Sequence, residues 1–440
     1  FKPGHYLSQF HAELTEDKAA LDKAISDAGF NSWTEYMGHV RRPWNHPQLP
    51  QVRPWAWANE IGDPSGLMFN ERNPYFHAVD PDGNQLPYTD TVQHRLFDTN
   101  DVFDMWVLNG EIDWQKRHVQ TGNFTLYKEG EAKGDYKVSP MVSQGGETLS
   151  INHDCQDPLI AEFFQNLLVR KALNVAIDRE IINEIAYDGL GVPRQASLTP
   201  NSPYYDPEAP GVYAYYDPDE ANRLLDEAGY DKKNSDGYRL WKDGSDQVFF
   251  TIEGTAGTGT TSSDAVLMVV QYFKDVGVNC TWNAIERSLY EEHHGANLCE
   301  AAWWGTGHET LLYLNWGNYY IGQYTDRPWA GGWGRYYHLG ESDPAASPPP
   351  EGHWLWDMWE IWDRGERALT QEERVEVVAE LMEIWKREVP VVGVLGELPN
   401  FCIVKNDLGN WLDGLYSSDR TADESIIGNP VLYWENPEDH

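Results

Sequence analysis

The sequence predicts an α/β fold, with one domain built around a largely parallel sheet. Beyond Glu147, short extended segments alternate with helical segments, and this order is typical of parallel sheets. The clearest part is a βαβαβ unit. Its strands are expected at residues 248–253, 278–285 and 298–304, with a helix at 264–276 and a shorter helix before the third strand.

Capping residues and apolar spacing mark the helices of this domain. Residues 163–186 are expected to form one helix, because apolar residues repeat along one face. Asp217 and Pro218 begin another, since aspartate can cap a helix and proline suits its first position. Thr370 and Glu373 form a capping box at the start of a later helix.

Residues 74–95 contain a turn that superficially imitates a calcium loop. Asp80, Asp82 and Asn84 have the ligand spacing, but the glycine comes two places early and Thr91 stands where a glutamate is needed. We therefore interpret this region as a hairpin followed by a strand. No metal and no cofactor is expected, since zinc and nucleotide-binding motifs are missing from the sequence.

The charge of the chain excludes several partners. Its 440 residues include 70 acidic and 33 basic side chains, for a net charge of -37, which repels nucleic acid and anionic lipid. No apolar run approaches the ~20 residues that cross a bilayer. The sequence begins at Phe1, so we expect any signal peptide, lipid-bearing cysteine and further amino-terminal residues to lie outside it.

The four cysteines lack the CxxC spacing of zinc and thioredoxin-like sites. They are Cys155, Cys280, Cys299 and Cys402. They can form up to two disulfides in an oxidising compartment, and buried free thiols are the alternative. His293 and His294 are adjacent and cannot both project to one side of a helix, so we expect a solvated pair rather than a metal site.

Aromatic residues are unusually dense between Trp303 and Trp333, where they alternate with glycines, amides and threonines. Aromatic faces beside hydrogen-bonding groups suit a ligand with apolar C–H faces and a polar rim, such as a sugar ring. The expected stacking residues are Trp304, Trp316, Trp329 and Trp333. Asn152, Thr306, Glu309 and Asn315 are the expected hydrogen-bonding residues. The alternative is that these indoles fill the core.

The segment VRKALNVAIDREIINEIAYDGLGVP at residues 169–193 resembles a signature of the family 5 extracellular solute-binding proteins of ABC importers. NPYFHAVDPDGNQLPYTDTV, YDPDEANRLLDEAGY and EAAWWG resemble family members in the same order. The opening KPGHYLSQFH and the stretch VPVVGVLGELPNFCIVKNDLGN are similar to a subgroup that includes carbohydrate receptors. The resemblance covers nearly the whole chain.

The resemblance implies a two-lobed, periplasmic-binding-protein-like type II fold with a hinge of crossing strands. Residues 152–398 would form lobe two, whereas 1–151 and 399–440 would belong to lobe one, which has further residues in family members. Residues 149–153 and 401–405 are expected to be neighbouring crossing strands. Cys155 and Cys402 would then approach disulfide range.

The resemblance also implies a binding function without catalysis, in an interlobe cleft. Peptide receptors of the family tend to carry an aspartate after the strand matching 300–304, but here GTGHETLLYLNW follows and only Glu309 could substitute. An unpaired buried ammonium is costly, so we favour an oligosaccharide over an oligopeptide.

A carbohydrate-active enzyme, with two carboxylates about 5 to 10 Å apart, is the alternative from another class. ABC permease subunits are the expected partners, and an extracellular or periplasmic, lipid-anchored location is expected.

Overall fold

A computed structural model describes residues 2–255, 263–305, 312–313, 317–414 and 429–439. The chain forms two compact units. The smaller comprises Phe1–Asp113, Val404–Leu412 and Glu424–His440, and the larger comprises Trp114–Ile403 and Asp413–Asp423. These units differ from the expected lobes, because residues 114–151 belong to the larger one. Neither the lobes nor their boundaries follow from this division, so they stay a prediction.

The smaller unit contains short helices and two small sheets. Its helices are α1 (Gly4–Leu7), α2 (Lys18–Asp27), α3 (Trp33–Val40) and α4 (Asn100–Leu108). Strands β1 (Trp55–Trp57), β2 (Leu67–Arg72) and β3 (Thr91–Arg95) form one antiparallel sheet, and β11 (Leu408–Gly409) pairs with β12 (Tyr433–Trp434).

The turn that imitates a calcium loop is a closed hairpin turn in the smaller unit. An antiparallel bridge joins Val79 to Gln85, which confirms the hairpin. The carboxylate of Asp80 accepts hydrogen bonds from the backbone of Asp82 and Asn84 and from the hydroxyl of Tyr88. These bonds use the oxygens of Asp80 to close the turn, which leaves little reason to invoke a cation.

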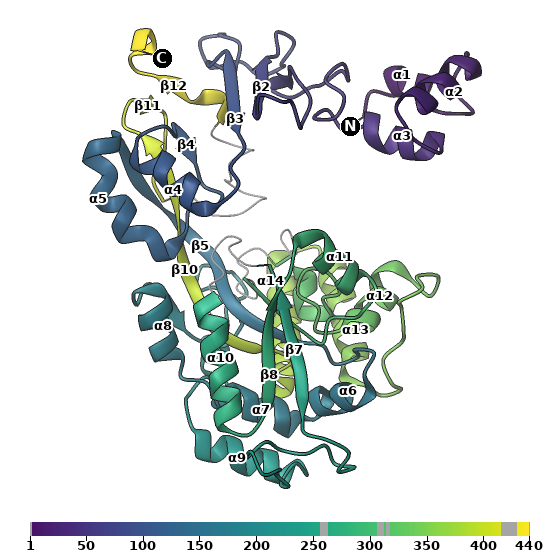
Figure 1. Ribbon diagram of the computed structural model, residues 1–440, viewed down its shortest axis with the longest axis vertical. Helices are drawn as coiled ribbons and strands as arrows, with labels where there is room; N and C mark the ends of the chain where they lie inside the picture. Colours follow the sequence, from purple (N-terminus) through teal and green to yellow (C-terminus); the bar gives the residue numbers. More distant parts are fainter. Residues whose placement is uncertain (1, 256–262, 306–311, 314–316, 415–428, 440) are drawn as a thin grey trace. The chain divides into compact units, whose positions relative to one another are not determined.

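The larger unit is built on a seven-stranded sheet, with helices on its two faces (Figure 1). The strand order is β4-β10-β5-β9-β7-β8, and β6 pairs with β10. The strands are β4 (Trp114–Gln115), β5 (Tyr136–Ile151), β6 (Val192–Pro193), β7 (Phe249–Gly254), β8 (Asn279–Ala284), β9 (Ala301–Gly305) and β10 (Val392–Lys405). The helices are α5 (Phe124–Gly134), α6 (Pro158–Gln165), α7 (Leu167–Val175), α8 (Arg179–Tyr187), α9 (Pro218–Glu227), α10 (Ser263–Asp275), α11 (Arg287–Gly295), α12 (Gly331–Leu339), α13 (Trp354–Arg367) and α14 (Gln371–Glu388).

The predicted βαβαβ unit is confirmed. Strand β7 runs parallel to both β8 and β9 in one sheet, with α10 between β7 and β8 and α11 between β8 and β9. Both predicted caps also form, because Asp217 accepts from the backbone of Glu220 and the Thr370–Glu373 capping box is complete. The single helix predicted at residues 163–186 is wrong. Asn166 and Asp178 cap new helices, so the segment is broken into α6, α7 and α8.

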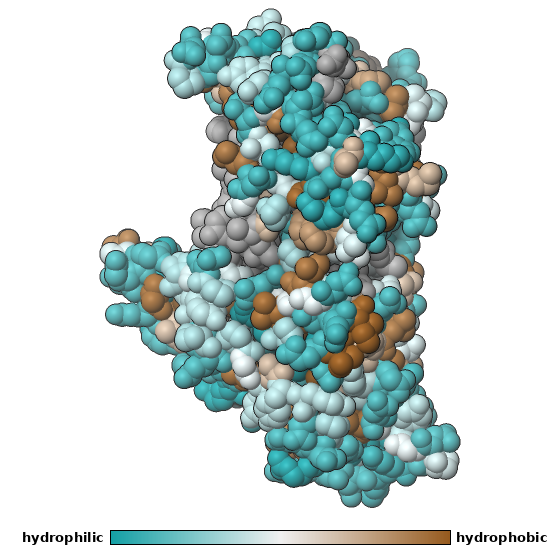
Figure 2. All heavy atoms as spheres, turned by 90° about the vertical axis from the view of Figure 1, so that its left-hand side faces the viewer, coloured by the Kyte–Doolittle hydropathy of each residue, from teal (hydrophilic) through white to brown (hydrophobic). Residues whose placement is uncertain are grey.

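Besides a small cluster around Tyr290, the apolar interior of the larger unit includes two large clusters. One packs α6, α7, α9 and α10 against the sheet through residues such as Leu149, Phe164 and Ile252. The other lies among α12, α13 and α14 and contains Trp329 and Trp385. Hydrophilic residues cover most of the surface drawn in Figure 2, with apolar residues in small groups.

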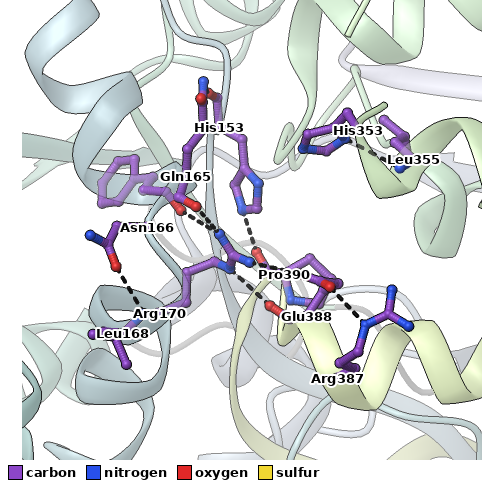
Figure 3. Close-up of polar contacts among 11 residues, drawn as sticks. His153, Gln165, Asn166, Leu168, Arg170, His353, Leu355, Arg387, Glu388 and Pro390 are labelled. Atoms are coloured by element: carbon purple, nitrogen blue, oxygen red, sulfur yellow. Dashed lines mark hydrogen bonds and ion pairs between the residues drawn. The ribbon is translucent and has the colours of Figure 1, made fainter. Parts of the chain in front are cut away.

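A buried arginine fastens α7 to the chain ahead of β10. Arg170, only 2% exposed, donates to the carbonyls of Phe164 and Gln165 and pairs with Glu388 at 3.2 Å (Figure 3). Beside it, the imidazole of His153 contacts the Pro390 carbonyl oxygen at 2.9 Å. These contacts satisfy carbonyls that helix ends would otherwise leave unpaired.

The long strands β5 and β10 are neighbours, as expected for crossing strands, but the expected pairing of their segments is wrong. His153, just beyond β5, contacts Pro390, just ahead of β10. Pro140, near the start of β5, accepts from the backbone of Gly414, beyond β10. The strands therefore run in opposite directions, and residues 149–153 lie near the start of β10 rather than near 401–405.

That direction also separates Cys155 from Cys402, which lie towards opposite ends of the two strands. All four cysteines are buried free thiols, so the expected disulfide is wrong. Burial raises the pKa of the Cys155 and Cys280 thiols to about 12, which keeps both thiols protonated and unreactive. Within the described ranges, no helix has both the length and the apolar character needed to cross a membrane.

Candidate functional site

The carboxyl ends of strands β7 and β9 form one edge of the sheet, and Glu253 and Trp304 lie there. Glu253 is opposite Ala302 in the register, and Trp304 follows two residues later on the same face. Trp303 points the other way and is 1% exposed in the core, whereas Trp304 is partly exposed. The two adjacent indoles therefore have different roles, as the alternation of a strand predicts.

Gly254 allows the strands to meet closely at this edge. A Cβ atom at this position would lie 2.7 Å from the Trp282 ring and 2.8 Å from the Trp303 carbonyl oxygen. No side chain fits there without moving β8 or β9. Residues 256–262, which come soon after β7, lie outside the described residues, whereas Gly254 itself is at the same edge of the sheet as Trp304.

Helix α11 supplies the support for the Trp304 ring. The Tyr290 ring is fully buried and lies parallel to it, with centroids 5.6 Å apart and an interplanar angle of 5°. One helical turn earlier, the Arg287 guanidinium lies 4.7 Å from the centroid of the same indole. Residues three apart share a helix face, so both side chains reach Trp304 from one face of α11.

A tight turn completes the site. Asp326 has a positive φ of 53°, and the backbone N–H of Arg327 donates to the Thr325 carbonyl across it. The Asp326 carboxylate accepts from Arg287 at 2.8 Å, and its backbone carbonyl accepts from the hydroxyl of Tyr290. This residue in a left-handed conformation is thus held by two side chains of α11.

A second polar group lies on the same sheet face. Nδ1 of His293 is 3.0 Å from both carboxylate oxygens of Glu253, and the Cys299 thiol donates to that carboxylate at 3.3 Å. His294 is buried beneath, 7% exposed. The prediction of a solvated histidine pair is therefore wrong. Throughout the described ranges, no three His, Cys, Asp or Glu side chains are placed to hold a metal ion.

Three of the predicted site residues are part of the packed interior. Asn152 is fully buried, donates to Asn297 and to the Cys299 carbonyl, and accepts from Gly331. Trp329 is fully buried, with Nε1 bonded to the Tyr319 carbonyl and its ring stacked on Trp354 at 5.9 Å. Trp333 is 4% exposed. All three are buried, and the polar side-chain atoms of Asn152 and Trp329 are bonded to the protein, so we leave these residues out of the candidate site.

Of the other predicted site residues, Trp304 is described by the structure and stays in the candidate site. Thr306, Glu309, Asn315 and Trp316 lie outside the described residues. Sequence reasoning missed Arg287, Tyr290 and Asp326. The i, i+3 spacing of Arg287 and Tyr290 was a usable signal, because it places both on one face of the predicted short helix. Asp326 gave no local signal, since its contacts to α11 span 36 and 39 residues.

Comparison with known proteins places the fold. The family described as "Bacterial extracellular solute-binding proteins, family 5 Middle" matches residues 64–322. An oligopeptide-binding protein, OppA, of known structure is 33% identical with a TM-score of 0.59, over 95% of this chain and 68% of that one. The stachyose complex of a periplasmic binding protein from Agrobacterium fabrum superposes with a TM-score of 0.71 at 16% identity, over 98% of this chain and 65% of that one. These likenesses confirm the two-lobed type II fold of periplasmic binding proteins.

Other relatives match shorter parts of this chain than these two structures do. A probable ABC transporter-binding protein of Deinococcus radiodurans is 26% identical over 220 residues, which is 49% of this chain and 36% of that protein. A periplasmic alpha-galactoside-binding protein of Rhizobium meliloti is 25% identical over 194 residues, 42% of this chain and 28% of that protein. The matched region thus spans about a third of these relatives. Since the family match covers more than half of the sequence, the chain belongs to the family 5 bacterial extracellular solute-binding proteins.

Proposed function

We propose that the chain is part of the substrate-binding component of an ABC importer, and that it binds a neutral oligosaccharide at the Trp304 edge of the larger unit. Family membership supports the receptor role. ABC permease subunits are then the protein partners, and the protein acts outside the cytoplasmic membrane, with a lipid anchor where its full-length form carries one. The receptor releases its ligand unchanged.

The observation that carries the sugar proposal is the mounting of Trp304. Trp304 is partly exposed, yet its ring is fixed by parallel contact with the buried ring of Tyr290 and by the Arg287 guanidinium, 4.7 Å from its centroid. A fixed aromatic face loses little conformational entropy when the C–H face of a pyranose covers it. Such a platform is worth about 0.5 to 1.5 kcal/mol beyond area burial.

The charges around this ring favour a neutral ligand. Arg287 pairs with Asp326 and Glu291, and His293 pairs with Glu253. Each of these basic side chains has a carboxylate beside it, so the site offers donors and acceptors that are already paired with one another. Sugar hydroxyls, which both donate and accept, match such a surface. Relatives support the same class, because one is named for alpha-galactosides and another was solved with stachyose.

An oligopeptide is the second candidate, favoured by the 33% identity to an oligopeptide-binding protein. A free peptide amine needs a carboxylate to offset its desolvation. At the described part of this site, Asp326 already pairs with Arg287, and Glu253 already contacts the imidazole of His293. A peptide would have to displace Arg287 or His293, so this candidate takes second place.

A ligand screen tests the proposal. Thermal unfolding is followed with stachyose, cellotetraose, mannotetraose and xylotetraose, and with short peptides as the contrasting class. A ligand at about 100 times its Kd adds roughly 2.7 kcal/mol to the free energy of unfolding. We expect stabilisation by at least one sugar and by none of the peptides. Stabilisation by peptides alone would make an oligopeptide the favoured ligand. Release of shorter sugars during incubation would identify the protein as an enzyme.

A further inference from the structure

We infer that Arg287 and Asp326 form a clamp for two adjacent hydroxyl groups of a pyranose whose C–H face lies on Trp304. The inference rests on the proposed function and specifies its ligand as a sugar with neighbouring free hydroxyls. It adds two specificity-determining residues, one a donor and one an acceptor, to the aromatic platform.

Arg287 presents a donor that the fold does not use. Its Nη2 atom donates to Oδ1 of Asp326 at 2.8 Å, and its Nε atom donates to Glu291 at 2.6 Å. Within the described ranges its Nη1 atom has no protein partner, and the side chain is 44% exposed. The guanidinium plane is rigid, so these two bonds fix the direction of the remaining donor.

Asp326 presents the matching acceptor. Its Oδ1 atom accepts from Arg287 and lies 4.0 Å from the imidazole of His294. Its Oδ2 atom has no hydrogen-bond partner among the described residues, and the side chain is 22% exposed. The free Nη1 and Oδ2 atoms therefore belong to two groups that are already bonded to each other. Neighbouring hydroxyls on a ring are held by such a donor and acceptor pair.

The backbone at Asp326 supports a functional role. Its φ of 53° lies in the left-handed region, which costs energy for residues other than glycine, although aspartate tolerates it better than most. Tyr290 bonds the carbonyl of this residue and also supports the Trp304 ring. One buried tyrosine thus positions both the aromatic platform and the carboxylate. Strained residues held in this way concentrate at ligand sites.

Two variants remove the atoms offered to the ligand and keep the charge or the acceptor beside them. In D326N the amide oxygen still accepts from Arg287 and asparagine still tolerates a positive φ, but an N–H₂ group replaces Oδ2. In R287K the charge next to Asp326 stays, whereas Nη1 and the Nε donor to Glu291 are lost. The matched controls are R223K and E227Q on α9, where an exposed arginine pairs with glutamates in the same way.

Affinity is measured by calorimetry on the full chain, with whichever tetrasaccharide of the screen stabilises the wild type. We expect D326N and R287K each to weaken binding by about tenfold or more, while R223K and E227Q bind as the wild type does. A methylated or deoxy form of that sugar that lacks one of the adjacent hydroxyls should lose the same factor against the wild type and little against D326N.

The outcomes separate the two proposals. Unchanged affinity of D326N and R287K, with a sugar that binds the wild type, overturns the clamp and leaves the proposed function standing. Failure of every sugar to stabilise the wild type overturns both. A fall in melting temperature of D326N beyond that of E227Q, with affinity unchanged, shows that the pair has a structural role only.

Discussion

The ring of Trp304 lies parallel to the ring of Tyr290, at an interplanar angle of 5°. One ring is partly exposed and the other fully buried, so the pair joins the surface of the larger unit to its interior. This arrangement makes Trp304 a fixed platform rather than a mobile surface residue, and it leads to the first two predictions.

Replacing Trp304 by alanine should weaken sugar binding by at least several-fold, because the aromatic face is lost. The melting temperature should change less than for a core truncation, which costs about 3 to 5 kcal/mol, since the ring is partly exposed. Calorimetry and thermal unfolding on the same variant give both values. Trp356→Ala is the matched control, because this tryptophan on α13 is 37% exposed and belongs to another cluster. A large loss of stability with unchanged affinity would show that Trp304 is core.

The Tyr290→Phe variant tests the support of the site. Phenylalanine keeps the parallel contact with Trp304 but loses the hydroxyl that donates to the Asp326 carbonyl. A single hydrogen bond contributes about 0.5 to 1.5 kcal/mol. We expect sugar affinity to fall by a few-fold, and Trp304→Ala to cost the same factor in affinity in this variant as in the wild type. Losses that do not add would mean that the hydroxyl also positions the indole.

Arg170→Met should destabilise the larger unit strongly. The substitution keeps most of the volume but leaves Glu388 and the carbonyls of Phe164 and Gln165 without their buried partner. Breaking a buried pair costs about 3 to 5 kcal/mol, measured by urea unfolding. Arg223→Met, which removes an exposed arginine with two carboxylate neighbours, should cost less than about 1 kcal/mol. Equal losses for the two variants would contradict this account of Arg170.

Asp154 should make stability depend on pH between about 4 and 7. Burial raises the pKa of this carboxyl from 3.8 to about 7, although a hydrogen bond from the Trp333 backbone opposes the shift. The folded state therefore holds its proton more tightly than the unfolded chain does. Stability is greatest below the unfolded pKa and falls as pH rises towards 7, by up to about 1.4 kcal/mol per pH unit.

The Asp154→Asn variant isolates this contribution, because its amide oxygen can still accept from the Trp333 backbone. Urea unfolding at several pH values should show a shallower decline for the variant than for the wild type. Parallel curves for the two proteins would assign the pH dependence to other groups.

Salt should stabilise the protein. With a net charge of -37, repulsion opposes the compact state until salt screens it. Raising NaCl from about 0.01 M to about 1 M shortens the Debye length from about 30 Å to about 3 Å. We expect the melting temperature to rise over this range, and KCl to act equally at the same ionic strength. A constant or falling melting temperature would show that this repulsion has little effect on stability.

The sequence alone determined the order of strands and helices in the βαβαβ unit, the caps at Asp217 and Thr370, and the family. These features depend on local spacing, on capping groups and on ordered motifs, all of which are written along the chain. The alternation of side chains along a strand is likewise a local property, and it places Trp303 and Trp304 on opposite sides of the sheet.

The tertiary structure decided what surrounds each of these residues. Density of aromatic residues could not tell Trp304, at the sheet edge, from Trp329, which is enclosed by Trp354 and Trp385. Nor could it pair Arg287 with Asp326, 39 residues later. The physical reason is that exposure and hydrogen bonding depend on which elements pack together. Tertiary packing also fixes the direction of β10 relative to β5, and this direction separates Cys155 from Cys402.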